Sequence, residues 1–272
     1  ISVLSVFPSY TSEIALRVLS ECGIDEPESC LTGLEELPVW ARRSVHWRSI
    51  REPFKSAALE HLNGSRSVVK KKAYAVLAAE KATQKDLLTG ENIELELQLA
   101  RLGSGVAEFA SDSVGVLRHY YNSGVQLQHQ RLEHLTHRYV AENYGYSAKA
   151  LHEKDKFEDY ELNALFILGM HEYKYGRVEE ALDMLTPVWK MRVSDSIRAY
   201  LDAATAAHLV GVIKSKDPEL TNEAISAYRD AITLGGRGLS DYAVSVSEHS
   251  LGVLLGRKDV RQFAEAEDLI KN

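Results

Sequence analysis

The chain has few of the residues that build disulfide-rich, metal-stapled or turn-rich folds. Its 272 residues include only two cysteines, six prolines and 17 glycines. Cys22 and Cys30 allow at most one local bridge and cannot supply a disulfide framework or a four-ligand zinc site. So few prolines and glycines exclude a fold of many short strands joined by tight turns, and the recurrence of Ala, Leu, Glu, Lys and Arg favours helices. We therefore expect an all-α fold.

Long apolar runs are also missing. The longest uncharged apolar stretch, about Ala203 to Ile213, is well short of the ~20 residues that a transmembrane helix needs, so we expect no membrane span. The chain opens at Ile1 without the basic start, apolar centre and small-residue cleavage site of a secretory signal. We expect a soluble protein of a reducing compartment, such as the cytosol or an organelle matrix after cleavage of a transit peptide, and the localisation itself stays unknown. The sequence does not choose between these two.

The net charge of −7 is unevenly distributed along the chain. Residues 1–40 contain one basic and seven acidic residues, residues 41–86 eleven and four, and residues 87–272 twenty and twenty-eight. Residues 41–86, called the basic segment below, could bind an anionic partner or could pair with the acidic segments of the same chain. We favour the second explanation, because charged runs on helices are usually solvated faces.

The C-terminal part of the chain repeats a spacing of small residues. Gly169 is followed twelve residues later by Ala181, and Gly252 is followed by Ala264 at the same separation. Between them, one helical face is predicted at Ala224, Tyr228 and Ala231. Small residues at a helix crossing let two antiparallel helices approach closely. The spacing therefore predicts successive helical hairpins.

These residues resemble the tetratricopeptide repeat family, whose helix-turn-helix unit of ~34 residues carries Leu-Gly on its first helix and Ala on its second. The resemblance covers about residues 160–272. It departs from the family in its period, because Ala181, Ala224 and Ala264 are 43 and 40 residues apart. In addition, no Trp begins a first helix and the usual closing Pro is missing. In the last unit Asp268 stands where the family has a large apolar residue. The resemblance implies helical hairpins stacked as a right-handed α-solenoid, with a concave groove lined by the first helices.

The chain before residue 150 is predicted to be helical as well. Apolar spacing predicts helices over about residues 11–21, 54–62, 67–88, 92–110 and 113–142. The charged stretch Lys149 to Asp159 is the expected surface connection to the repeats. We therefore predict a helical region over residues 1–150, which could contain degenerate hairpins, and repeats over residues 151–272. One continuous solenoid is an equal alternative.

The sequence has no local motif for catalysis. It contains no Gly-x-Ser-x-Gly elbow, and its glycine clusters lack the spacing of phosphate-binding loops. His129, Glu133 and His137 have a spacing that suits metal ligation on one helix, but no second helix offers an obvious partner, so surface hydrogen bonding is favoured. His171-Glu172 does not begin an H-E-x-x-H site, because Tyr175 stands in place of the second histidine. We predict a protein with no catalytic residue, no metal and no cofactor.

The leading functional hypothesis is a non-enzymatic scaffold or adaptor that binds other proteins as a subunit of a larger assembly. The resemblance places partner-binding side chains of the groove at Asn163, Phe166, Met170, Tyr173, Lys174, His249, Val253 and Arg257. This set lacks the repeated Lys, Arg and Asn of the family's carboxylate clamps. An apolar or mixed helix is therefore the expected ligand.

The alternative hypothesis is a helical-repeat protein that binds RNA or another polyanion through the basic segment. Its candidate contacts are Arg48, Arg51, Lys55, Lys70, Lys81 and Lys85. Tyr74, Trp40 and Trp47 are candidates for base stacking. The acidic net charge of the whole chain argues against this alternative, and so does the lack of a regular pair of base-reading positions in each unit.

Overall fold

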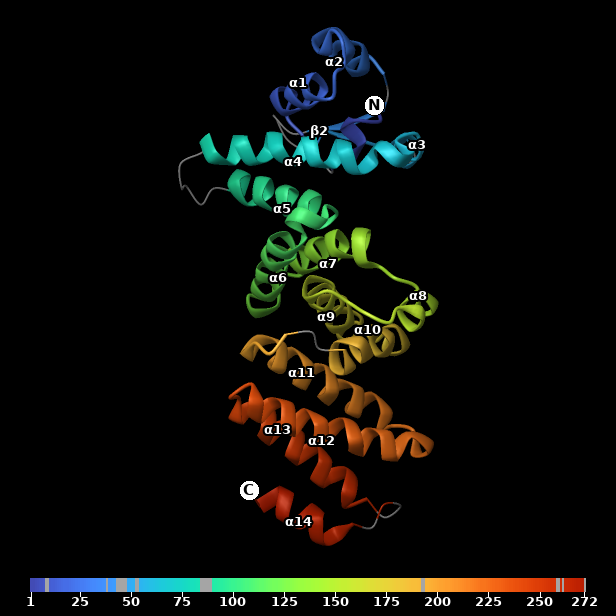
Figure 1. The fold of residues 1–272 in the computed structure, drawn as a ribbon, viewed down its shortest axis with the longest axis vertical. Helices are drawn as coiled ribbons and strands as arrows, with labels where there is room; N and C mark the ends of the chain where they lie inside the picture. The colour runs from blue at the N-terminus through green and yellow to red at the C-terminus, as the bar shows by residue number, and fades with distance from the viewer. Residues whose placement is uncertain are drawn as a thin grey trace. The chain divides into compact units, whose positions relative to one another are not determined.

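The protein is a helical chain that divides into two compact units, Ile1–Tyr120 and Tyr121–Asn272. A computed structural model describes residues 1–7, 10–37, 39–42, 48–51, 54–83, 90–191, 194–257, 260 and 262–271. Within these residues the chain forms fourteen α-helices and one two-stranded sheet (Figure 1). None of the described helices is long and apolar enough to cross a membrane. The predicted helical class is confirmed, and the small sheet is an addition that the sequence did not suggest.

The first unit packs its helices around one apolar core. Its elements are η1 (Leu4–Val6), α1 (Ser12–Glu21), α2 (Pro27–Glu35), β1 (Trp40–Arg42), β2 (Arg48–Ile50), α3 (Phe54–Glu60), η2 (Asn63–Ser65), α4 (Arg66–Thr83), α5 (Gly90–Ser104), η3 (Ala107–Phe109) and the start of α6 (Ala110–Gln126). Thr11 begins α1 by accepting a hydrogen bond from the Ile14 backbone N–H. Buried residues of η1, α1 and α4, among them Leu4, Val18 and Leu77, meet in the core.

The sheet of the first unit lies inside the basic segment. β1 and β2 are antiparallel, with Trp40 opposite Ile50 and Arg42 opposite Arg48. Tyr10 and Arg48 also exchange two backbone hydrogen bonds, of 2.8 and 2.9 Å. The N-terminal segment is thus paired with the basic segment, which the sequence analysis had not connected to it.

The second unit begins within α6 and continues to the C-terminus. Its further elements are α7 (Gln130–Tyr144), α8 (Ala148–Glu153), α9 (Asp159–Lys174), α10 (Val178–Lys190), α11 (Ile197–Lys214), η4 (Pro218–Leu220), α12 (Thr221–Arg237), α13 (Asp241–Leu255) and α14 (Phe263–Lys271). From α9 onward, each helix packs against the next one in the chain. The two units divide within α6, whereas the sequence analysis placed its boundary at residues 149–159.

The prediction of a single helix over residues 113–142 is wrong. Gln128 has a φ of +53°, outside the right-handed helical region, and separates α6 from α7. His129 caps α7, because its Nδ1 accepts a hydrogen bond of 3.2 Å from the Leu132 backbone N–H. A turn at residues 127–129 therefore joins α6 to α7.

Three consecutive hairpins, α9/α10, α11/α12 and α13/α14, cross at a glycine of the first helix. A Cβ atom on Gly169 would lie 2.7 Å from Leu185 Cγ, and one on Gly211 would lie 2.8 Å from the Tyr228 ring. A Cβ atom on Gly252 would lie 2.8 Å from Ile270 Cγ1. At such distances a methyl group on the glycine would force the facing side chain to shift. We call these three contacts the glycine crossings.

The register that the sequence analysis gave to the last hairpin is wrong by two residues. Ala264 is exposed, and Ala266 is the buried alanine of α14. When Ala266 is aligned with the buried alanines of the other two hairpins, the residue four positions later is Ile270 rather than Asp268. The other two hairpins also have a large residue there, Leu185 and Tyr228. The number of residues from the crossing glycine to the buried alanine is 12, 13 and 14 in the three hairpins. The last hairpin therefore has two more residues between these positions than the first.

Candidate functional site

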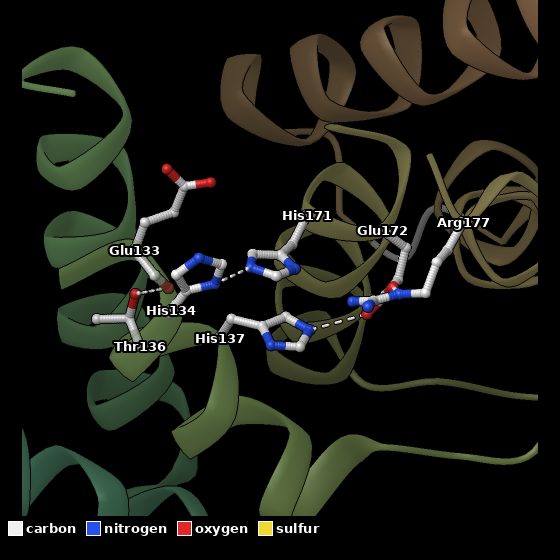
Figure 2. A network of polar contacts seen from close by, with 7 residues as sticks. All are labelled: Glu133, His134, Thr136, His137, His171, Glu172 and Arg177. Carbon is white, nitrogen blue, oxygen red and sulfur yellow. Dashed lines mark hydrogen bonds and ion pairs between the residues drawn. The ribbon is translucent and has the colours of Figure 1, made fainter. Parts of the chain in front are cut away.

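Two neighbouring helices of the second unit, α7 and α9, bring three histidines together (Figure 2). His134 and His137 are three residues apart on α7 and therefore share a face of that helix. His171 lies on α9, and Glu172 follows it. We call His134, His137, His171 and Glu172 the histidine cluster.

Direct contacts connect the members of the histidine cluster. His134 Nδ1 lies 3.0 Å from His171 Nε2, and the ring of His137 stacks on the ring of His171 with centroids 3.7 Å apart and an interplanar angle of 14°. His137 Nε2 lies 3.0 Å from Glu172 Oε1. Arg177, at the start of α10, donates a hydrogen bond from Nε to Glu172 Oε2. Figure 2 marks the contact of His134 with His171 and that of His137 with Glu172, and it shows Arg177 beside Glu172.

Burial keeps the imidazoles of His137 and His171 uncharged at neutral pH, because it lowers the pKa of both side chains. His171 is 3% exposed, and desolvation is the main cause that lowers its pKa to about 4. Burial also lowers the pKa of His137, against the opposing effect of Glu172. Burial alone would raise the pKa of Glu172, but the hydrogen bond and charge of Arg177 outweigh it and lower that pKa. The cluster therefore combines neutral imidazole nitrogens with an ionised carboxylate.

A second polar contact between α7 and α9 lies beside the cluster. Glu133 has no exposed surface, and its Oε2 accepts a hydrogen bond of 2.6 Å from Lys174 Nζ. Figure 2 shows the Glu133 carboxylate directed away from the imidazoles. Glu133 therefore takes part in an ion pair of its own.

The residues that sequence spacing offered as metal ligands separate in space. Of the three, only His137 belongs to the histidine cluster, because His129 caps α7 and Glu133 pairs with Lys174. The structure instead brings His137, His171 and Glu172 together, with one candidate ligand atom from each lying within 4.8 Å of the others. Sequence reasoning missed this set because it looked for ligands on one helix, and nothing in the sequence pairs α7 with α9.

Several of the predicted groove residues are used inside the second unit. Phe166 is 9% exposed, and Met170 and Tyr173 pack against the same apolar cluster. Lys174 binds Glu133, and Arg257 donates a hydrogen bond of 2.7 Å to the Ser215 carbonyl oxygen at the end of α11. These side chains contribute to packing and to helix ends.

Asn163, His249 and Val253 keep accessible surface, as Lys174 does. Asn163 lines a pocket at α9, α10 and α11, together with Val188 and Asp202. His249 is exposed, and Val253 is 53% exposed. The predicted set therefore keeps two exposed side chains on α13, His249 and Val253, in addition to Lys174 on α9.

The basic segment forms ion pairs with both acidic parts of the chain. Arg48 pairs with Glu35, and Lys81 Nζ lies 2.6 Å from Glu96 Oε1. Tyr74 stacks on Phe109, with ring centroids 4.2 Å apart. These contacts fit the favoured explanation of the basic charge, that it is balanced within the chain.

The other polyanion candidates are placed as follows. Lys55 is buried, Lys70 is half-buried and Arg51 is exposed. Lys85, Trp47 and the side chain of Trp40 lie outside the described residues. Polyanion binding stays a prediction.

Comparison with known proteins identifies no relative of this chain. No protein-family model, no curated protein and no solved structure matches it. The resemblance to the tetratricopeptide family stays a prediction, and the functional argument depends on the residues and contacts described above.

Proposed function

We propose that residues 159–271 are a repeat module of the tetratricopeptide type that binds another protein, and that the chain is a scaffold or adaptor in a larger assembly. The three glycine crossings support this proposal, because they give successive hairpins the same close packing. Hairpins that stack in sequence bury most of their surface against their neighbours and leave the first helices to a partner.

The observation that carries the proposal is an exposed stripe on α13, the first helix of the last hairpin. Tyr242, His249 and Val253 lie within about 40° of one another around an ideal helix. All three are exposed, Tyr242 at 81% and Val253 at 53%. Two large apolar side chains on one face offer the spaced anchors that an amphipathic helix uses to dock. We call these three residues the α13 stripe.

The charge of the module indicates the chemistry of the partner helix. Residues 159–272 contain 18 acidic and 13 basic residues. Asp241 and Glu248 lie together on one flank of α13, about 80° or more around an ideal helix from the α13 stripe. The fitting partner is therefore an amphipathic helix of another protein, with an apolar face and with Lys or Arg beside it.

Site-specific photocrosslinking tests this proposal. A photoreactive amino acid replaces Val253 in one preparation and Leu127 in another, because Leu127 is 75% exposed but lies far along the chain from α13. The same native extract is used for both. We expect a crosslinked partner band when the photoreactive residue is at position 253 and no such band when it is at position 127.

A substitution control uses the same pair of sites. The double variant Tyr242→Ser and Val253→Ser should reduce partner capture by at least about tenfold, whereas Leu127→Ser should leave it unchanged. Equal capture by the double variant and the wild type would contradict the proposal. Recovery of the chain alone in every preparation would contradict it as well.

A further inference from the structure

We propose that His137, His171 and Glu172 bind one divalent transition-metal ion of the zinc class, which joins α7 to α9, and that His134 is a positioning residue for this site. The proposal concerns a different surface from the α13 stripe and does not depend on the protein-binding function. It also goes against the sequence-based expectation of a protein without metal.

The spacing of the ligand atoms suits such an ion. His137 Nε2 and Glu172 Oε1 are 3.0 Å apart, and two bonds of ~2.1 Å to one ion would then enclose an angle of about 90°. An ion can therefore take the place of the proton that these two atoms now share. His137 would carry its ring proton on Nδ1 instead.

The third ligand needs a small movement. The three candidate atoms lie within 4.8 Å of one another, whereas two ligands of one ion are at most ~4.2 Å apart, twice a bond of ~2.1 Å. Rotation of the stacked His137 and His171 rings about χ2 can bring their lone pairs together, because this torsion has a broad minimum.

One ring nitrogen of His171 is buried and could bind a metal ion. Its Nδ1 is buried and has no hydrogen-bond partner among the described residues. Leaving such an atom without a hydrogen bond is unfavourable, so a buried polar atom normally has a partner. A metal ion on Nδ1 would supply one.

His134 fixes the tautomer that metal binding requires. When His171 Nε2–H donates to His134 Nδ1 across the observed 3.0 Å, His171 Nδ1 is left with a lone pair for the ion. Histidine ligands of metals commonly donate their other ring N–H in this way. Arg177 holds the far oxygen of Glu172 and leaves Oε1 to face His137. Figure 2 shows both supporting contacts.

The donor set selects the class of metal. Two imidazole nitrogens and one carboxylate suit Zn²⁺, Co²⁺ or Ni²⁺, whereas Mg²⁺ and Ca²⁺ prefer sites made of oxygen. Three protein ligands leave a fourth position for water or for a group from a partner.

Calorimetric titration of the full chain with ZnCl₂, after removal of metal by a chelator, tests the proposal. We expect one zinc ion per chain and no heat from MgCl₂. His137→Asn and His171→Asn should each weaken zinc binding by about 100-fold or more, and His134→Asn by about tenfold with the stoichiometry retained. His208→Asn is the matched control, since His208 is a half-buried histidine of the second unit and bonds Ser247 rather than a carboxylate.

Cobalt provides a readout that a purely structural role of these residues would not change. Co²⁺ bound by the three ligands should give visible absorption bands that His171→Asn abolishes and His208→Asn preserves. If His171→Asn does not fold, Glu172→Gln takes its place, because glutamine keeps the shape of the side chain and loses the charge. Absence of zinc binding to the wild type, or equal affinity in the ligand variants and the wild type, would overturn the proposal.

Discussion

Lys174 Nζ on α9 donates a hydrogen bond of 2.6 Å to Glu133 Oε2 on α7, and the Glu133 side chain has no surface in contact with solvent. The sequence resemblance placed Lys174 in a partner-binding groove. In the structure its ammonium group compensates a buried carboxylate, so the two helices are connected by an ion pair whose acidic member cannot be hydrated.

Removing the ammonium group should therefore destabilise the second unit strongly. Lys174→Met leaves Glu133 buried without its partner and should lower the free energy of unfolding by about 3–5 kcal/mol. The double variant with Glu133→Gln should recover part of this loss, because no charge is then buried. Urea unfolding of the four proteins in the cycle measures the coupling. Lys149→Met, which breaks the exposed Lys149–Glu153 pair, should cost no more than about 0.5 kcal/mol, and an equal cost for the two lysine variants would refute the prediction.

The glycine crossings predict that alanine is harmful at positions where it would normally help a helix. Gly169→Ala and Gly211→Ala would press a methyl group against Leu185 and Tyr228. Overpacking costs about 1–3 kcal/mol, and the better helix propensity of alanine offsets up to about 1 kcal/mol of it. We therefore expect each variant to lose up to about 2 kcal/mol in urea unfolding.

Gly236 provides the matched control for this prediction. It lies in α12, and a Cβ atom there would meet nothing within 4 Å. Gly236→Ala should therefore leave the protein as stable or stabilise it by up to about 1 kcal/mol. If all three variants change stability in the same direction, close packing at the crossings is not what requires glycine.

His208 predicts a loss of stability in mild acid. It lies on α11, its Nδ1 is 3.1 Å from Ser247 Oγ on α13, and its ring meets the Tyr228 ring on α12. Burial lowers its pKa in the folded chain, whereas the unfolded chain binds the proton with a pKa of about 6.5. The contribution of His208 to the free energy of unfolding is therefore complete above about pH 6.5. It decreases as the pH drops below that value, by at most ~1.4 kcal/mol per pH unit.

Unfolding in urea at roughly pH 7.5 and pH 5 measures this effect, with a chelator present. Because other histidines are buried too, the wild type is compared with His208→Gln, which should lose less stability between the two pH values. Repeating the comparison in high salt separates burial from surface charge effects, which salt screens. The prediction fails if the two proteins lose stability equally.

The corrected register of α14 can be tested with one charge at two positions. Ala266 is buried against Leu251, Leu254 and Leu255, whereas Ala264 is exposed on the same helix. Ala266→Asp should detach α14, because an unpaired charge cannot stay in an apolar cluster. Ala264→Asp places the same group in the first turn and should be neutral or slightly favourable.

Hydrogen exchange should locate the damage. In Ala266→Asp the amides of α13 and α14 should lose protection first, while those of α9 and α10 keep it, because local opening need not involve the whole unit. The reverse ranking of the two aspartate variants would restore the register predicted from the sequence.

The sequence predicted what depends on local spacing. It predicted the helical class and most helix positions, because apolar periodicity and caps act within a few residues, as at Thr11 and α1. It also identified Gly169 and Gly252 as crossing residues. The sequence analysis missed Gly211, because it looked for a separation of twelve residues between glycine and alanine. In the middle hairpin, Gly211 and Ala224 are thirteen residues apart.

What the sequence did not predict depends on contacts between distant segments. His137 and Glu172 are 35 residues apart, and only the packing of α7 on α9 makes them neighbours. The strand pair and its contact with Tyr10 likewise join segments that share no pattern. The break at residues 127–129 was missed because no proline or conspicuous cap residue marks it, and His129 is an unusual cap.

The glycine crossings also bear on how the chain folds. Each crossing glycine meets a side chain 16, 17 or 18 residues further along, so forming the contact closes only a short loop. The entropy of loop closure changes by about 0.1 kcal/mol between 16 and 18 residues, far less than the ~1–3 kcal/mol expected for a methyl group at the crossing itself. Contacts so close in sequence favour rapid folding, because each of them joins residues of one hairpin. Insertions should therefore be tolerated in the turns of these hairpins and rejected where their helices meet.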